Sequence, residues 1–248
     1  MSYYISYNYL VKMIDLIEKG QRYMDKIDYK KKDKEFYSPK TEPSLIKIPN
    51  MNFLMVDGHG DPNEKDGDYH KAIELLYALS YSIKMGRKKL PSDSDTTIID
   101  YVVPPLEGFW WLEDIHDMDF TQKSKYCWTA IIRQPDFVTL KTLEEAKIAV
   151  QKKKPFLDVS KVRLQQLEEG YCVQCMHLGP YDDEPVTLNK IENYINANNL
   201  INGIGSLTAD HQIRRHHEIY LSDPRKANPA TMKTILRHPV IRKDPTWN

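Results

Sequence analysis

The sequence predicts an α+β protein made of two similar strand–helix–strand–strand units. Two observations predict this fold. A short strand-like segment that runs up to a glycine occurs twice, at 51–56 before Gly60 and at 171–178 before Gly179. In each half, a helical periodicity and two further strand-like segments follow in the same order. We expect one continuous antiparallel sheet, with both helices on one face and a ligand cleft on the other.

Segments with apolar residues at helical spacing predict the helices. One is expected near residues 68–85 in the first unit, one near 184–198 in the second, and a connecting helix at 143–153. Residues 3–27 have similar spacing, interrupted by Gly20. The residues expected to face the sheet are Tyr69, Ile73, Leu76, Tyr77, Ser80 and Ile83 in the first helix and Leu188, Ile191, Tyr194 and Ile195 in the second.

The remaining strands are expected near 97–103, 126–133, 216–221 and 233–237. When Gly60 is laid on Gly179, the two helices coincide and Tyr101 falls on Tyr220. This overlay predicts that the strands carrying Tyr101 and Tyr220 are related by a pseudo-two-fold axis.

The charge pattern suggests how the chain is divided. Residues 30–35 are lysines and acidic residues, a composition that is typical of a solvated linker. We therefore expect an N-terminal helical extension and charged linker at 1–36, the main domain at 37–242 and a short tail at 243–248.

Composition excludes several classes of protein. Of the 248 residues, 41% are hydrophobic and 28% charged, with 35 basic and 35 acidic side chains. A general nucleic-acid-binding protein normally carries a basic excess, so direct DNA binding is not expected. No apolar run reaches the roughly 20 residues that span a bilayer, and residues 1–5 lack the layout of a signal peptide. We expect a cytoplasmic protein that does not bind membranes.

Two motifs with metal-like spacing are better explained as structural residues. Cys172 and Cys175 lie three apart in an expected strand, so their sulfurs point to opposite faces. No further Cys or His pair completes a zinc site, and we interpret both as buried free cysteines. We interpret His216 and His217 as a surface or edge pair. The sequence has no phosphate loop or dinucleotide fingerprint, so we expect no metal and no cofactor.

Glu218 is the leading candidate for a functional carboxylate. Alternation along the expected strand at 216–221 places Ile219 and Leu221 on one face, toward the helices. Glu218 and Tyr220 then share the other face, toward the cleft.

A carboxylate in mid-strand is costly unless it is paired, and Arg214 or Arg215 is the expected partner of Glu218. Tyr101 would point into the same cleft if the repeat holds. The alternative is that Glu218 forms only a salt bridge on an exposed sheet face.

A second group of aromatic residues follows the strand that carries Tyr101. Glu107, Trp110 and Trp111 lie in a segment bounded by prolines and Gly108, which we interpret as a turn. Adjacent Trp residues in a turn are poor core residues and good walls for a flat ligand. The alternative is a packed Trp pair that caps the end of the sheet.

Several of these strings resemble the signature regions of GyrI-like domains. They are GPYDDEP at 179–185 and HEIYLSDPR at 217–225. Pro104 to Trp110 and IRQPDFV at 132–138 resemble a stand-alone branch of that family. The similarity covers about 37–242.

The resemblance implies a duplicated fold with a small-molecule cleft. In drug-sensing members a buried Glu among aromatic rings receives cationic ligands, and the stand-alone branch includes hydrolases that open the cyclopropane of DNA-alkylating natural products. Glu218 matches the carboxylate in both. We assign Glu218 and Tyr220 as catalytic candidates. The ligand-binding candidates are Tyr101, Glu107, Trp110, Trp111 and Tyr181.

Two functions stay open from the sequence. The first is a binding module that senses or sequesters a flat, aromatic or cationic molecule. The second is a hydrolase in which Glu218 activates water for attack on a strained carbon. A DNA-binding transcription regulator is less expected, because the sequence has no clear helix-turn-helix.

Overall fold

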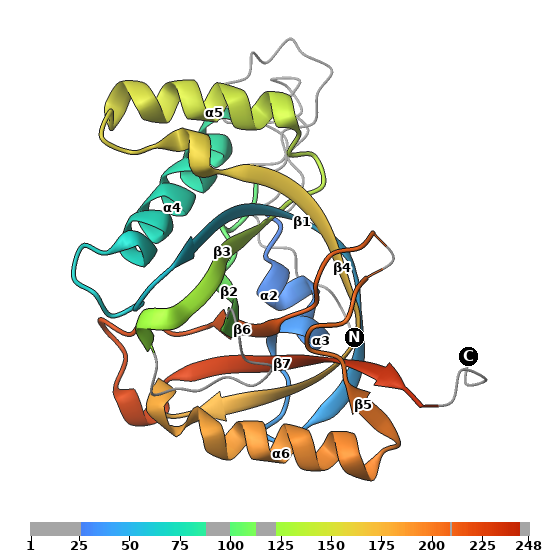
Figure 1. The fold of residues 1–248 in the computed structure, drawn as a ribbon. Coiled ribbons are helices and arrows are strands. Elements are labelled where there is room, and N and C mark those ends of the chain that lie inside the picture. The colour runs from blue at the N-terminus through green and yellow to red at the C-terminus, as the bar shows by residue number, and fades with distance from the viewer. Residues whose placement is uncertain (1–25, 88–99, 113–122, 209, 244–248) are drawn as a thin grey trace, which may run out of the picture.

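The computed structural model describes residues 26–87, 100–112, 123–208 and 210–243, and its fold is of the α+β class, as predicted (Figure 1). Its helices are α2 (Tyr29–Lys32), α3 (Lys34–Tyr37), α4 (Asp68–Arg87), α5 (Leu140–Lys153) and α6 (Glu184–Ala197), with short 3-10 turns at Lys123–Lys125, Val159–Lys161, Tyr181–Asp183 and Pro229–Thr231. Its strands are β1 (Ser44–His59), β2 (Leu106–Leu112), β3 (Tyr126–Gln134), β4 (Arg163–Leu178), β5 (Leu200–Asn202), β6 (His216–Tyr220) and β7 (Lys233–Arg242).

The three helices expected at 68–85, 143–153 and 184–198 correspond to α4, α5 and α6. The helical spacing at 3–27 lies almost wholly outside the described residues. A capping box fixes the start of α5: Thr139 Oγ1 accepts from the Thr142 N–H, and the Thr139 N–H donates to Thr142 Oγ1. None of the helices in the described residues is long and apolar enough to cross a membrane.

The antiparallel sheet closes into a barrel. The strands follow the order β4-β1-β3-β2-β6-β7-β5, and β4 also pairs with β7. Six strands therefore form a ring, with β5 attached to β7 beside it. The sheet is therefore a closed barrel and has an outer face and an enclosed inner face.

Both long helices of the repeated units pack on the outer face, so the prediction that they share one face is confirmed. α4 covers Leu54 and Ala130, whereas α6 covers Val173 and Leu236. In Figure 1, α4 and α6 lie outside the ring at opposite ends. Cross-strand neighbours join the two helix-covered patches on that one face: Ala130, Gly108, Glu218 and Leu236.

The inner face is filled by strand side chains and by α2 and α3, which lie inside the ring (Figure 1). Tyr29, Phe36 and Tyr37 are buried there against Ile131. The segment expected as a linker at 30–35 therefore forms parts of two short helices. Most of its charged side chains stay exposed, while the aromatic neighbours fill the barrel.

The duplication is visible at the ends of the two longest strands. Gly60 follows β1 with φ 104° and donates its N–H to Tyr126 O at 2.7 Å. Gly179 follows β4 with φ 134° and donates to Met232 O at 3.1 Å. These positive φ values favour glycine because a Cβ would clash with the backbone.

The predicted equivalence of Tyr101 and Tyr220 is wrong. Among residues 100–105, Tyr101 makes only an isolated bridge to Ile27, and the strand begins later, at Leu106. One cross-strand row in the second unit contains His177, Thr234 and Tyr220. The matching row in the first unit contains Gly58, Trp128 and Trp110. Trp110 is therefore the counterpart of Tyr220.

Cys172 and Cys175 are both buried, as predicted. Cys172 lies in the inner cluster and Cys175 in the cluster beneath α6, so the two side chains face opposite sides of β4. Both are free thiols.

Candidate functional site

Glu218 lies at the seam between the two units, where β2 pairs with β6 and Gly108 stands opposite it. Only 7% of the residue is exposed. Tyr220 Oη donates to Glu218 Oε2 at 2.7 Å, and His216 Nε2 lies 3.0 Å from Glu218 Oε1. The carboxylate is thus fixed from both sides by residues of its own strand.

Each of these two partners is held by a further residue. Trp110 Nε1 donates to Tyr220 Oη at 2.8 Å, which orients the hydroxyl toward Glu218. His238 Nε2 lies 2.9 Å from His216 Nδ1. Burial and His216 lower the pKa of His238 well below its usual value, so His238 is neutral. Neutral His238 can donate its Nε2–H to His216 Nδ1, and His216 Nε2–H then donates to Glu218.

Aromatic rings from both units surround this chain of hydrogen bonds. Tyr69 of α4 lies 5.0 Å from both Trp110 and Trp128, measured between ring centroids. From the other unit, the Tyr181 ring packs edge-on against Tyr220 at 5.8 Å. Burial raises the pKa of Tyr69, Tyr181 and Tyr220, so all three hydroxyls stay protonated at neutral pH and can donate hydrogen bonds.

A second carboxyl group, Glu184, adjoins the site at the first residue of α6. It is 2% exposed. Burial, the charge of Glu218 and that of Asp182 raise the pKa of Glu184 well above its usual value of 4.5. A buried carboxyl group with a raised pKa can serve as a proton donor in acid–base chemistry.

A different polar network fills the inner face behind Glu218. Arg237 Nη1 donates to Glu169 Oε1 at 2.8 Å, and His217 Nδ1 lies 3.0 Å from Glu169 Oε2. His217 Nε2 lies 3.1 Å from Glu107 Oε2, and Tyr37 Oη donates to Glu107 Oε1 at 3.1 Å. The barrel interior thus holds two carboxylates against one arginine and one histidine.

The structure gathers Glu218, Tyr220, Trp110 and Tyr181 in one place. It places Glu107 and Trp111 on the other face of β2, inside the barrel. Trp110 and Trp111 lie in a strand, not in a turn, so their side chains point to opposite faces. Tyr101 is wholly buried elsewhere, where its hydroxyl donates to Ser80 O at 3.2 Å and its ring packs on Phe137.

Three further expectations about this strand are corrected. Ile219 and Leu221 face the barrel interior, and Glu218 faces the helix layer. Neither Arg214 nor Arg215 pairs with Glu218: Arg214 donates to backbone carbonyls and Arg215 stacks on Trp111.

His216 and His217 are not a surface or edge pair, since they are 1% and 0% exposed and each binds a carboxylate. The sequence reasoning assigned no site role to His216, His238, Tyr69 or Glu184. A signal existed for Glu184, which lies inside the GPYDDEP string.

The comparisons with known proteins agree with this architecture. A model of the GyrI-like small molecule binding domain family matches residues 41–240. The solved structure of an uncharacterized conserved protein from Listeria innocua is 50% identical with a TM-score of 0.77, covering 87% of this chain and 100% of that one. Two structures of hydrolases from Listeria innocua are each 48% identical, with TM-scores of 0.75 and 0.73; the matches cover 88% and 87% of this chain and 100% of theirs.

No match to a curated protein was found. The family match spans both strand–helix–strand–strand units and the seam between them, where Glu218 lies. The chain therefore belongs to the GyrI-like small molecule binding domain family.

Proposed function

We propose that this protein binds a flat, aromatic or cationic small molecule against Glu218, for sensing or detoxification. The observation that carries the proposal is that the buried Glu218 carboxylate has no lysine or arginine partner among the described residues. Its partners are a tyrosine hydroxyl and a histidine ring, and no lysine or arginine of the described residues forms an ion pair with it. A nearly buried carboxylate without such a cation strongly favours a cationic ligand.

The surrounding rings support the same class of ligand. Tyr69, Trp110 and Tyr181 come from three different elements and offer apolar faces around the carboxylate. Aromatic faces attract cations and stack on flat molecules. The Trp110 indole N–H donates to Tyr220, and the tyrosine hydroxyls stay protonated. The aromatic walls therefore carry no charge that competes with Glu218.

Calorimetry with N-methylquinolinium and its neutral counterpart 1-methylnaphthalene tests the binding proposal. The cation should bind the parent at least about tenfold more tightly than the neutral molecule, because the carboxylate contributes only to the first. Glu218→Gln should abolish that preference, while Glu145→Gln, on the exposed side of α5, should keep it. Equal preference in the parent and in folded Glu218→Gln would show that Glu218 does not select the ligand.

The second candidate function is hydrolysis of a strained ring, and two observations favour it. Hydrolases are among the relatives at 48% identity, and Glu184 stays protonated next to Glu218. In this reaction Glu218 takes a proton from water, and the water oxygen bonds to a cyclopropane carbon. The carbon–carbon bond breaks toward a conjugated carbonyl, and Glu184 gives its proton to the carbonyl oxygen.

Turnover of a cyclopropane-bearing DNA-alkylating compound separates the two functions. If the protein is a hydrolase, Glu218→Gln should lower kcat by about two orders of magnitude or more, and Glu184→Gln by a similar factor. Binding of the compound should change little, since the aromatic walls remain. If the parent binds the compound tightly but forms no product, the result contradicts hydrolysis and agrees with the binding function.

A further inference from the structure

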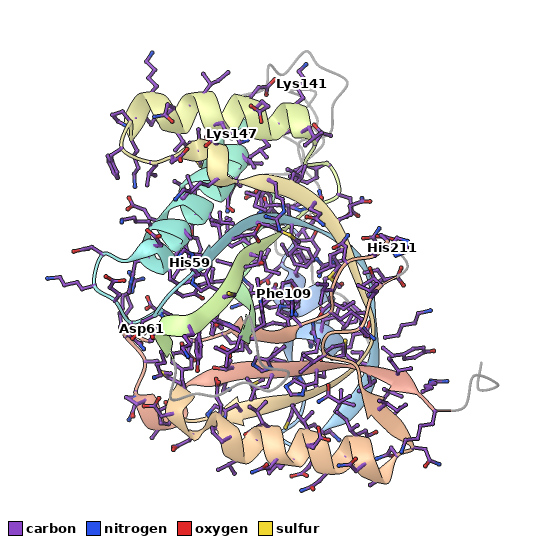
Figure 2. All side chains as sticks on the ribbon, in the orientation of Figure 1. His59, Asp61, Phe109, Lys141, Lys147 and His211 are labelled. Atoms are coloured by element: carbon purple, nitrogen blue, oxygen red, sulfur yellow. The ribbon has the colours of Figure 1, made fainter. Side chains whose placement is uncertain are left out.

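A cavity of about 280 Å³ opens on the inner face of the barrel, on the face of β2 that carries Phe109 and Trp111. Its apolar floor and wall come from the strands, through Met55, Leu167 and Phe109. Phe109 belongs to the inner cluster, and its label lies within the ring of strands in Figure 2. Thr208, Gln212 and Ile213 lie at the rim. Next to them, the Gly205 N–H donates to the Arg214 carbonyl at 2.9 Å and the Arg214 N–H donates to the Ser206 carbonyl at 2.8 Å. The cavity is therefore separate from the Glu218 site, although both sites include side chains of β2.

Trp111 gives this cavity a flat aromatic wall. The guanidinium of Arg215 lies over the Trp111 ring, with its central carbon 4.5 Å from the ring centroid. Among the described residues, Arg215 forms no ion pair with any carboxylate. A guanidinium that stacks on an aromatic ring keeps its N–H edge free for a planar acceptor.

A second guanidinium of the cavity, that of Arg214, is held in place by the backbone. Arg214 Nη2 donates to the carbonyls of Glu169 and Tyr171, and Nη1 donates to the carbonyl of Val240 at 3.1 Å. Its Nε is buried without a hydrogen-bond partner in the described structure. Neutral carbonyls orient Arg214 but do not neutralise its charge.

The other charges that line the cavity are compensated. Arg163 makes a two-pronged ion pair with Asp57. Glu169 is bound by Arg237 and His217. What remains is the positive charge of Arg214 and Arg215 beside an aromatic wall.

We propose that this inner cavity is a second ligand site that takes a small aromatic carboxylate. The ring of the ligand packs on Phe109 and Trp111, and its carboxylate lies against the guanidinium edge of Arg215, within reach of the charge of Arg214. The ligand class is opposite in charge to the one proposed for Glu218. The two sites can therefore be tested independently.

Calorimetry with 2-naphthoate, neutral 2-naphthamide and 2-naphthylmethylammonium tests the proposal. The carboxylate should bind at least about tenfold more tightly than the other two, because a charge-assisted contact forms only with the anion. Arg215→Gln should remove that preference, whereas Glu218→Gln should leave it unchanged. Stronger naphthoate binding in Glu218→Gln would place the anion at the Glu218 site and overturn the proposal, as would equal binding of acid and amide.

Two substitutions of Ile213 at the rim test the proposal even if Arg215→Gln changes the fold. Ile213 lines the cavity and is 50% exposed, so its replacement should not disturb the core. Ile213→Glu should weaken naphthoate binding severalfold by repulsion, and Ile213→Gln should not. Indistinguishable affinities for these two variants, together with unchanged binding in folded Arg215→Gln, would show that no anion occupies this cavity.

Discussion

Glu218 depends on a neighbour that has no side chain. Gly108 stands directly opposite it across β2 and β6. A Cβ placed on Gly108 would lie 2.8 Å from Trp110 Nε1 and 3.3 Å from Tyr220 Oη. The glycine therefore leaves room for the hydrogen bond from Trp110 to Tyr220, and that bond orients the hydroxyl that Glu218 accepts.

Gly108→Ala should consequently weaken ligand binding at Glu218. The added methyl group must push Trp110 or Tyr220 away, and the lost hydrogen bond corresponds to about 0.5–1.5 kcal/mol, or a severalfold loss of affinity for a flat cation. Calorimetry on the variant measures this loss. Gly86→Ala is the control, since a Cβ there has nothing within 4 Å and lies in α4, where alanine favours the helix. Unchanged affinity in Gly108→Ala would mean that the Trp110–Tyr220 contact does not matter.

Glu184 should make the stability of the protein fall with rising pH. Its pKa in the folded state is well above 4.5, because burial and Glu218 disfavour the charged form. The folded protein therefore keeps this proton longer than the unfolded chain, and its contribution to the unfolding free energy declines as pH rises above about 4.5. Glu184→Gln removes that slope.

Thermal melts of parent and Glu184→Gln between pH 4.5 and 8 measure this effect. The Tm of the variant minus the Tm of the parent should increase as the pH increases. Parallel Tm curves for the two proteins across this range would contradict a raised pKa at Glu184.

At the level of single elements, β6 shows what alternation in a sequence can and cannot predict. The prediction that Glu218 and Tyr220 share one face is confirmed by the hydrogen bond between them. The choice of face was wrong. Ile219 on one side packs inside the barrel, and Glu218 on the other is buried beneath the helix layer. Because both faces are covered, hydrophobicity alone does not identify the helix side.

The strand β2 was missed for a related reason. The apolar residues before Pro104 and Pro105 resemble a strand, and Gly108 with its two adjacent tryptophans resembles a turn. In the structure the prolines precede the strand and the glycine lies within it. Gly108 serves a tertiary contact with Trp110 and Tyr220, which no local pattern reveals.

The helices α2 and α3 should contribute strongly to barrel stability, although they look like a linker in the sequence. Phe36 is buried in the inner cluster, and its carbonyl accepts from Arg237 at 3.1 Å. Phe36→Ala should lower the unfolding free energy by about 3–5 kcal/mol, as for other buried aromatic residues. Urea denaturation measures the change, with Lys32→Ala on the exposed side of α2 as the control. A loss no larger than that of the control would mean that this segment does not support the barrel.

For the whole molecule, the sequence predicted the two repeated units and the shared face of their helices, but not the closed ring. Closure depends on the pairing of β4 with β7 in addition to its pairing with β1. No local pattern in β1 or β7 specifies that both pair with β4, so their sequences are equally compatible with an open sheet. The buried network of Glu169, Arg237 and His217 connects β4, β7 and β6 at this closure.

That network should give the barrel a distinct acid sensitivity. Burial acts to raise the pKa of Glu169, but His217 and Arg237 lower it to about 2. A lowered carboxyl pKa adds stability that is complete above the unfolded value of 4.5 and is lost as the pH falls toward 2. Burial acts to lower the pKa of His217, but Glu169 and Glu107 raise it, so its contribution is complete below 6.5 and is lost at higher pH. The network should therefore stabilise the barrel most between about pH 4.5 and 6.5.

Urea unfolding of parent and Glu169→Gln at pH 5.5, 4 and 3 tests this account of closure. At pH 5.5 the variant leaves Arg237 buried without its anion, which should cost about 3–5 kcal/mol of unfolding free energy. As the pH falls to 3, the parent loses the contribution of Glu169, and the gap between the two proteins should narrow. Glu168→Gln, one residue away on the exposed side of β4, should behave as the parent at each pH. A gap that stays constant from pH 5.5 to 3 would show that Glu169 supports the barrel by packing and not by its charge.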